Sequence, residues 1–339
     1  MKKIALITGI SGQDGAYLAE FLLKKNYRVI GADRRSARDN KWRLRYLGIE
    51  NKIEIVNIDL TEISSLIRLF ENYKFDEVYN LAAQSFVGTS FVNPIVTSQA
   101  TAIGTLNILE VIRNKKKKPK FYQASSSEMF GDIENNYQNE MSKFNPQSPY
   151  AVSKVFAHQI TKNYRKSYKM FAVNGILFNH ESPLRGEEFI TRKITLGLSK
   201  IMMGKLNCLE VGNIYAKRDW GYAADYVEAM WKMLQQNKPE DYVIATGKTY
   251  SIKYFINLAT KILKIKTKWV GSGLNERLIN LKNKKVIIKI NKKFFRPAEV
   301  NYLRGNYSKA KKILKWKPKI NLKELIKIML KSDLKNHAK

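Results

Sequence analysis

A glycine-rich turn close to the N-terminus constrains the fold of this chain more than any other feature. The segment TGISGQDG at residues 8–15 separates an apolar run at 3–8, which predicts a strand, from an amphipathic pattern at 14–25, which predicts a helix. Glycines at such a turn let the backbone bend sharply and let a phosphate approach the helix N-terminus. A glycine-rich turn alone is a common loop, but one between a strand and a helix predicts a dinucleotide-binding site. The candidate binding residues are Gly9, Gly12, Gln13, Asp14 and Gly15.

The rest of the first half continues this alternation of apolar runs and helical patterns. Helices are predicted at 60–72, 101–113 and 150–168, between strands at 27–32, 53–58, 77–82, 120–124 and 171–177. Strands that alternate with helices form a parallel sheet covered on both faces, and right-handed crossovers make that sheet doubly wound. The predicted fold class is therefore α/β, with a doubly wound, Rossmann-like parallel sheet.

After about residue 180 the alternation loosens. Helical patterns occur at 192–203, 223–236, 251–263 and 322–331, and the lysine-rich segment 279–295 predicts a loop or a hairpin. A chain of 339 residues is long for one core, so its length favours about two domains. We expect a dinucleotide-binding domain at 1–180 and a smaller C-terminal substrate-binding cap at 181–339, with some crossing of the chain between them.

The chain is strongly basic, with 61 basic and 29 acidic residues and a formal net charge of +32. Such a charge suggests a nucleic-acid-binding protein. However, the lysines are spread along the chain, and no zinc-finger, RNP-like or helix-turn-helix signature accompanies them. We therefore predict no nucleic-acid partner and interpret the lysines as a solvated surface, or as a field that steers an anionic substrate or cofactor.

The sequence also indicates a location and excludes classes of metal site. We find no apolar run of about eighteen residues and no signal peptide, so we expect a cytoplasmic protein without a membrane partner. Cys208 is the only cysteine, and the three histidines, His158, His180 and His337, are widely spaced. An internal disulfide is impossible, and no metal site is expected.

The end of the second predicted strand bears on the choice between NAD and NADP. Asp33 is suited to a free ribose, as in NAD, whereas Arg34, Arg35 and Ser36 are suited to a ribose phosphate, as in NADP. Two adjacent arginines supply the charge that a phosphate needs, so NADP is favoured and NAD remains possible. Asp59 is a candidate for the adenine edge. Leu60, Leu81 and Ala83 complete the predicted cofactor crevice.

Two polar groups near residues 125–155 predict proton transfer. Tyr150 and Lys154 are four residues apart on a predicted helix and so share one face. An ammonium favours the phenolate, so we expect Lys154 to lower the pKa of Tyr150 and make it a general acid/base. Such a pair alone is weak evidence. Ser126 and Glu128 end the preceding strand at the same crevice, where a hydroxyl and a carboxylate suit proton abstraction and dehydration; an ordinary helix cap is the simpler alternative.

Four separated stretches together resemble the extended short-chain dehydrogenase/reductase family and, within it, the GDP-mannose 4,6-dehydratases. The stretches span nearly the whole chain. The segments NGILFNHESP at 174–183 and FRPAEV at 295–300 are far more specific than the glycine turn. The matching stretches are 8–20; 124–131 with 148–154; 174–183 running through 185–186 to 191–193; and 218–221 with 295–300.

The resemblance implies a lyase reaction, in which GDP-mannose becomes GDP-4-keto-6-deoxymannose with a recycled nicotinamide cofactor. It implies that Tyr150 takes the O4 proton, that Lys154 orients the nicotinamide ribose, and that Ser126, where the family usually has threonine, hydrogen-bonds O4. Glu128 is implied to remove the C5 proton and to help protonate the leaving C6 hydroxyl. Arg185 is expected to bind the cofactor, and the substrate is expected to contact Ser85, Asn179, Lys193, Arg218, Arg296 and Glu299.

Two departures from the family pattern keep alternatives open. Phe86 stands where histidine is common, which indicates a changed sugar pocket, and Asp33 is unusual beside the double arginine. A GDP-manno-heptose 4,6-dehydratase therefore remains an alternative, as does a nucleotide-sugar 4-oxidoreductase or epimerase. Glu128 argues against the latter, because elimination needs a carboxylate. The family also implies a homodimer or homotetramer, with Arg35 near a subunit boundary.

Overall fold

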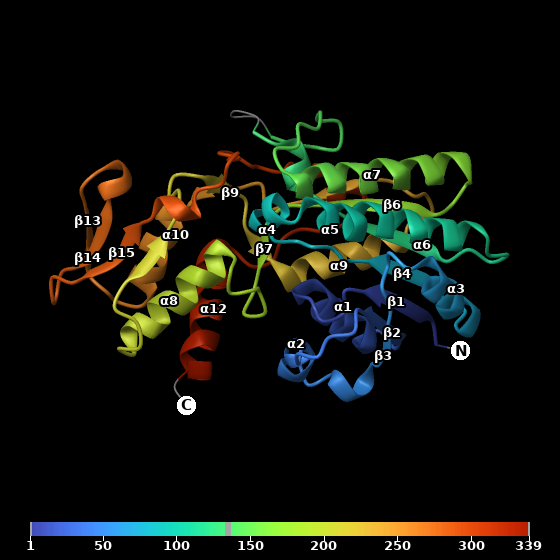
Figure 1. The fold of residues 1–339 in the computed structure, drawn as a ribbon, viewed down its shortest axis with the longest axis horizontal. Coiled ribbons are helices and arrows are strands. Elements are labelled where there is room, and N and C mark those ends of the chain that lie inside the picture. Colours follow the sequence, from blue (N-terminus) through green and yellow to red (C-terminus); the bar gives the residue numbers. More distant parts are fainter. Residues whose placement is uncertain (1, 133–136, 338–339) are drawn as a thin grey trace.

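The computed structural model describes residues 2–132 and 137–337, and a parallel sheet occupies the centre of the first half (Figure 1). The sheet has seven strands in the order β11-β6-β5-β4-β1-β2-β3, and every neighbouring pair is parallel. This order confirms the predicted doubly wound topology. The strands are β1 (Ile4–Thr8), β2 (Arg28–Asp33), β3 (Glu54–Asn57), β4 (Glu77–Asn80), β5 (Lys120–Ser126), β6 (Ala172–Leu177) and β11 (Tyr242–Ile244).

Helices cover both faces of this sheet, because the central strands are apolar on both sides. In β1, Ala5 and Ile7 belong to one core and Leu6 to the other, as the alternation of side chains along a strand requires. The first core includes residues of α1 (Gln13–Lys24) and α9 (Ala223–Leu234), which pack together. The second core includes residues of α3 (Ile63–Asn72), α6 (Gly104–Arg113) and α7 (Pro149–Ser167).

The start of α7 is set by local sequence. Ser148 is the N-cap residue, and its Oγ accepts a hydrogen bond of 3.1 Å from the Ala151 amide. Pro149 follows at the first helical position, where a missing N–H costs nothing. Tyr150 therefore lies in the first turn of α7 and Lys154 one turn later, and both side chains are buried.

The segment before α6 is more helical than the sequence indicated. It comprises α4 (Val87–Val92), α5 (Pro94–Ser98) and the π-helical turn η2 (Gln99–Ile103), which leads into α6. The continuous stretch Pro94–Arg113 is long and apolar enough to cross a membrane by length and composition, so the expectation that no such run exists is wrong. Half of that stretch is buried against the protein, as in core helices of soluble proteins.

The second half builds a smaller sheet with its own core. Its strands are β8 (Leu209–Val211), β13 (Thr267–Val270), β14 (Arg277–Asn280) and β15 (Val286–Ile290), in the order β13-β14-β15-β8. The pairing of β14 with β15 is antiparallel, so the lysine-rich segment forms the hairpin rather than the loop. The helices of this part are α8 (Ile190–Met202), α10 (Ile252–Ile262) and α12 (Leu322–His337).

Segments from the second half of the sequence pack on the central sheet. Helix α9 lies in the second half of the sequence but packs on the central sheet (Figure 1). Strand β11, from the same half, belongs to that sheet, and α11 (Ser308–Ile313) packs beside it. The domain division near residue 180 stays a prediction about organisation. Two short ladders follow the division near residue 180: β7 (His180–Glu181) pairs with β10 (Gly221–Tyr222), and β9 (Lys217–Arg218) pairs with β12 (Tyr250–Ser251). The remaining short helices are α2 (Trp42–Tyr46), η1 (Glu50–Lys52), η3 (Ser127–Phe130), η4 (Gly273–Asn275) and η5 (Lys292–Phe294).

Candidate active site

The glycine turn between β1 and α1 has a geometry that only glycine permits at two positions. Gly9 has φ of +71°, and its amide donates a hydrogen bond of 2.9 Å to the carbonyl of Ala32 on β2. A Cβ on Gly15 would lie 2.3 Å from the Gly9 carbonyl oxygen, which is far too close. The turn therefore brings the N-terminus of α1 close to the ends of β1 and β4, where α1 can receive an anionic group.

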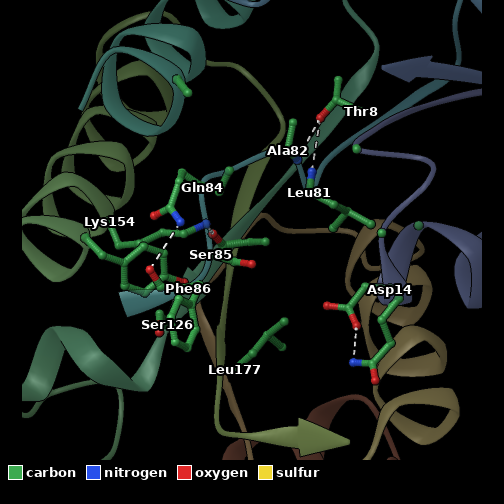
Figure 2. Close-up of a pocket in the computed structure, with 18 of the residues that line it drawn as sticks. Thr8, Asp14, Leu81, Ala82, Gln84, Ser85, Phe86, Ser126, Lys154 and Leu177 are labelled. Atoms are coloured by element: carbon green, nitrogen blue, oxygen red, sulfur yellow. Dashed lines mark hydrogen bonds between the residues drawn. The ribbon is translucent and has the colours of Figure 1, made fainter. Parts of the chain in front are cut away.

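A cavity of about 550 Å³ runs along the carboxyl ends of the central strands, and Figure 2 shows part of its lining. This edge of a doubly wound sheet is where ligands bind. The cavity contains most of the residues that the sequence singled out. They are Gly9, Gly12, Gln13, Asp14, Gly15, Asp33, Arg34, Asp59, Leu60, Leu81, Ala83, Ser85, Ser126, Glu128, Tyr150, Lys154, Asn179, Arg185 and Arg296.

The end of this cavity where the adenosine is expected combines a hydrogen-bonded carboxylate with exposed basic groups. Asp33 accepts hydrogen bonds from Ser11 Oγ, from the Arg34 amide at 3.0 Å and from Asn40 Nδ2 at 3.4 Å. Arg34, Arg35 and Ser36 line a smaller adjoining cavity of about 280 Å³. The carboxylate is thus tied to protein donors, while the two arginines face the space beside it.

At the other end, Tyr150 and Lys154 are held by buried contacts. Lys154 Nζ donates a hydrogen bond of 2.8 Å to the carbonyl of Ala124 on β5 and lies 5.8 Å from the Tyr150 ring centroid. Burial lowers the pKa of Lys154 to about 8. Burial also raises the pKa of Tyr150 to about 12, and Ser126 only partly offsets this by hydrogen bonding to the phenol. The pKa of Tyr150 is thus raised rather than lowered in the chain by itself, because desolvation of the buried phenol is the largest influence on it. That Lys154 lowers this pKa stays a prediction.

Glu128 lies where β5 passes into η3. Ser126 caps this turn, because its Oγ accepts a hydrogen bond of 3.2 Å from the Glu128 amide. Ser126 is therefore the N-cap residue of η3, and it also lies within hydrogen-bonding reach of Tyr150. The Glu128 carboxylate is 9% exposed and forms an ion pair of 3.6 Å with Arg296, so a buried carboxylate and a phenol share one cavity.

The structure brings only some of the predicted substrate residues to the cavity wall. Arg218, Glu299 and Lys193 are not part of the lining. Arg218 lies on β9 and pairs with Glu299 at 3.2 Å, close enough to Glu128 and Arg296 for their charges to act on its pKa, which burial lowers. Lys193 lies on α8, with Nζ 3.5 Å from the ring centroid of Phe294. These residues form a second layer on the cap side of the cavity.

Sequence reasoning missed His180 and Phe189 as parts of the site. His180 Nε2 lies 2.7 Å from Asp14 Oδ2, and this carboxylate raises the pKa of His180 against the effect of burial. Phe189 packs edge-to-face on Phe86 at 5.5 Å and lies under the Arg185 guanidinium. His180 stands just beyond the end of β6, so its position at a strand end was the signal that could have found it. Phe189 carried no such signal.

Among the described residues, no group of three His, Cys, Asp or Glu side chains is placed to hold a metal ion. Asn179 Oδ1 is buried without a hydrogen-bond partner, and Asn179 lines the cavity beside His180. An orphaned buried acceptor at a cavity wall indicates a donor supplied by a ligand.

Known proteins resemble this chain in sequence and in fold. The GDP-mannose 4,6 dehydratase family matches residues 6–329. A GDP-mannose 4,6-dehydratase of Vibrio cholerae is 49% identical over 350 residues, covering 98% of this chain and 94% of that protein. A GDP-mannose 4,6 dehydratase of Drosophila melanogaster is 47% identical, covering 98% and 86%.

Solved structures share the fold at lower sequence identity. A dTDP-glucose 4,6-dehydratase from Bacillus anthracis, in complex with NAD, has a TM-score of 0.81 and 19% identity, covering 99% of this chain and 98% of that chain. The protein RMD from Pseudomonas aeruginosa, complexed with NADPH, has a TM-score of 0.77 and 22% identity, covering 99% and 100%. The sequence matches, the doubly wound sheet and the Tyr150–Lys154–Glu128 cavity agree, and the chain belongs to the GDP-mannose 4,6-dehydratase family.

Proposed function

We propose that this protein is a lyase that removes water from GDP-mannose and forms GDP-4-keto-6-deoxymannose. One observation carries the proposal: the Glu128 carboxylate lies in the same cavity as Tyr150 and Ser126. A simple alcohol dehydrogenase or a 4-epimerase needs the phenol but has no use for this carboxylate. The similarity to named GDP-mannose 4,6-dehydratases over nearly the full chain supports the same reaction.

The residues present fit a nicotinamide dinucleotide. The glycine turn leaves no room for a Cβ at Gly15 and opens the N-terminus of α1 to a diphosphate. Arg34, Arg35 and Ser36 face the space beside Asp33, and Asp33 is already hydrogen-bonded by protein donors, so we propose NADP rather than NAD. When bound, the nicotinamide supplies a hydride acceptor for C4 and returns the hydride to C6.

The chain's own residues then divide the proton transfers. Tyr150 takes the proton from O4, and Ser126 holds that oxygen by a hydrogen bond. Glu128 takes the C5 proton, which the C4 ketone makes acidic, and passes a proton to the C6 hydroxyl as it leaves as water. The proton that Tyr150 took from O4 balances the reaction by going to C5 when hydride returns to C6. Lys154 is anchored to the carbonyl of Ala124, and it would hold the nicotinamide ribose of a bound cofactor. Placing the carboxylate and the phenol in one buried cavity keeps both transfers away from bulk water.

The test is mass spectrometry of the protein incubated with GDP-mannose and, separately, with GDP-manno-heptose. The loss of one water from GDP-mannose supports the proposal, and an unchanged mass contradicts it. Water loss from the heptose derivative alone would favour the alternative substrate, for which Phe86 is the motivation. Phe86 and Phe189 form an apolar wall of the cavity at the point where the family commonly has histidine.

We also propose that the protein acts as a homodimer in the cytoplasm, without nucleic-acid or membrane partners. The helices α4 and α5 and the turn η2 contact α7. Apolar side chains on these elements are exposed, including Val92 at 77% and Ile95 at 72%, with Ile103, Val152 and Phe156. A contiguous apolar surface of this kind indicates a protein partner, and a second copy supplies a matching one. Sedimentation should give a dimer for the native chain and a monomer for Ile95→Asp; a native monomer would contradict the proposal.

A further inference from the structure

Arg185 reaches the cavity from the short loop between β7 and α8, and other residues of this segment hold its side chain. The centre of its guanidinium lies 3.5 Å from the centroid of the Phe189 ring. Its Nε lies 3.2 Å from Glu181 Oε2. Arg185 and Phe189 line the cavity, whereas the Glu181 side chain is only 2% exposed. The guanidinium therefore contacts a buried carboxylate and also borders the space that a ligand would fill.

Glu181 is fixed by its own surroundings. It lies on β7, where its backbone pairs with Tyr222 of β10, and its Oε2 accepts a hydrogen bond of 2.6 Å from Thr191 Oγ1. Thr191 lies in the first turn of α8 and is 1% exposed. A carboxylate this deeply buried needs hydrogen-bonding or charged partners, and Thr191 and Arg185 are such partners. The carboxylate cannot follow the guanidinium, so it sets where Arg185 Nε lies.

The backbone of the same loop is held separately. Arg43 of α2 donates one hydrogen bond of 2.7 Å from Nε to the carbonyl of Leu184 and one of 3.0 Å from Nη1 to the carbonyl of Ser11. Ser11 belongs to the glycine turn, so Arg43 ties the loop beside Arg185 to that turn. A change at Glu181 should therefore release the side chain of Arg185 and leave the loop in place.

Other carboxylates could otherwise capture this guanidinium. Asp14 and Glu188 also line the cavity, and against the effect of burial the charges of His180 and Arg185 lower the pKa of Asp14. Asp14 is already paired with His180, whose Nε2 lies 2.7 Å from Asp14 Oδ2. An arginine side chain has several rotatable bonds, so without a fixed partner it would turn between these carboxylates. The Glu181 contact selects one position among them.

The selected position suits an anion in the cavity. The charge of Arg185 acts on Asp14 at the glycine turn and on Tyr150 at α7, so Arg185 lies between these two parts of the cavity. A guanidinium binds phosphate through paired hydrogen bonds. We propose that Glu181 is a positioning residue, which holds Arg185 against Phe189 so that its terminal nitrogens stay available to an anionic group of the bound dinucleotide. This inference rests on the proposed nicotinamide cofactor and adds to it a residue outside the cavity lining.

A double-mutant cycle tests this role. Glu181→Gln keeps the size of the side chain and can still accept the hydrogen bond of Thr191, but it removes the charge that holds the guanidinium. Calorimetric titration of the full chain with NADP, or with NAD should the native chain prefer it, should show binding about fivefold weaker than in the native protein. In the Arg185→Ala background the same substitution should change the affinity by less than about a factor of two, because the positioned side chain is gone.

Thr191→Val provides a second route to the same contact. It removes the hydroxyl that fixes Glu181 and leaves the carboxylate in place, so binding of the dinucleotide should weaken about two- to threefold, again only while Arg185 is present. This variant keeps the test decisive if Glu181→Gln unfolds. Glu276→Gln is the matched control. Glu276 is 3% exposed and pairs with Lys253 of α10, so its substitution should lower the unfolding temperature and leave the affinity for the dinucleotide unchanged.

A fragment of the cofactor distinguishes positioning from a general loss of fold. The 2′,5′-bisphosphate of adenosine carries the ribose phosphate that is expected near Arg34 and Arg35 but lacks the nicotinamide half. Its affinity should therefore be the same in Glu181→Gln and in the native chain, whereas a general distortion of the site would weaken both ligands equally.

Each outcome separates this inference from the proposed function. Unchanged binding of the dinucleotide in Glu181→Gln, equal losses with and without Arg185, or an equal loss for the fragment overturns the role of Glu181. Failure of the native chain to bind either dinucleotide overturns this inference together with the proposed cofactor. A loss that depends on Arg185, with no water lost from GDP-mannose by the unmodified protein, supports the inference and overturns the dehydratase reaction.

Discussion

Two parts of the cavity near Glu128 are built in different ways: the part formed by α7 and the part formed by the cap loop that carries Arg296. Tyr150 and Lys154 project from a regular helix, and the Lys154 ammonium is fixed by a backbone carbonyl. Arg296 lies in a loop of the cap, and in the described part of the chain it pairs with the Glu128 carboxylate across the cavity. The difference teaches that a helix and a backbone carbonyl hold one side of the cavity, whereas a loop and a counter-ion hold the other.

The largest expected effect lies at the anchored end. Tyr150→Phe should lower turnover about a hundredfold to ten-thousandfold, because the phenol is the proton carrier for O4. Cofactor binding and the unfolding temperature should change little, since the ring stays in place. Steady-state kinetics with a fluorescence titration of the cofactor checks both. A variant with a near-normal rate would remove Tyr150 from the mechanism.

A comparably large effect is expected for Glu128→Gln, with a different signature. Tyr150 and Lys154 remain, so oxidation at C4 still occurs once, but the amide cannot accept the C5 proton. Reduced nicotinamide should accumulate on the variant without 6-deoxy product. Absorbance measures the reduced nicotinamide, and mass spectrometry measures the product.

The unmodified protein is the control for that experiment. It should release no reduced cofactor and should exchange solvent deuterium into C5 of the product. Full product formation by Glu128→Gln would assign the base to another residue. Stoichiometric reduction of cofactor by the unmodified protein would show a plain dehydrogenase.

At the exposed adenosine end the effect should be smaller. Arg35→Ala should weaken NADP binding about tenfold and leave NAD binding nearly unchanged, because a charge-assisted hydrogen bond contributes only to the phosphate. Titrations with both dinucleotides check this ratio. A preference of the native protein for NAD would instead show that Asp33 decides the choice of cofactor. It would also weaken the contrast between the part of the cavity anchored by α7 and the exposed part at the adenosine end.

The smallest effect concerns the stability of the folded chain and involves His158 on α7. His158 is buried, with Nδ1 3.0 Å from Ser125 Oγ and Nε2 3.8 Å from Asp241 Oδ2. Burial lowers the pKa of His158 to about 4, although Asp241 acts in the opposite direction. Because the unfolded chain takes up this proton near pH 6.5, the folded state should lose about 2 kcal/mol as the pH falls from 6.5 to 5.

His158→Gln provides the comparison for that prediction. Glutamine keeps a hydrogen-bonding group for Ser125 but does not titrate. Urea unfolding at pH 7 and pH 5 should therefore show a smaller drop in the free energy of unfolding for the variant than for the native chain. Equal drops in both proteins would mean that His158 does not carry this part of the acid sensitivity.

Local sequence was enough to predict the regular part of the molecule. The glycine turn and alternating apolar runs predicted β1 to β6 and the helices α1, α3, α6 and α7, because each pattern is set by neighbours along the chain. The short helices α2, α4 and α5 were not predicted. Strand β11 was not predicted. It is three residues long and gains its place in the sheet only by pairing with β6, from residues about seventy positions away.

The candidate site likewise has features that the sequence predicts and features that it does not. Tyr150, Lys154 and Glu128 could be named from spacing and from the family resemblance, since their elements are regular. The direction of the pKa shift of Tyr150 could not be predicted from the sequence. Burial by residues distant in sequence raises this pKa, whereas a nearby lysine suggests that it is lowered. The pairings of Asp33 with Ser11, of His180 with Asp14 and of Arg296 with Glu128 were equally invisible.

The sequence by itself thus determined the order of most elements and the glycine turn, and it named the candidates for proton transfer. Only the tertiary structure decided which carboxylates are engaged in hydrogen bonds or ion pairs and which groups have pKa values away from their usual range. The physical reason is that propensity and periodicity act between near neighbours, whereas desolvation and ion pairing depend on whatever the fold brings within a few ångströms.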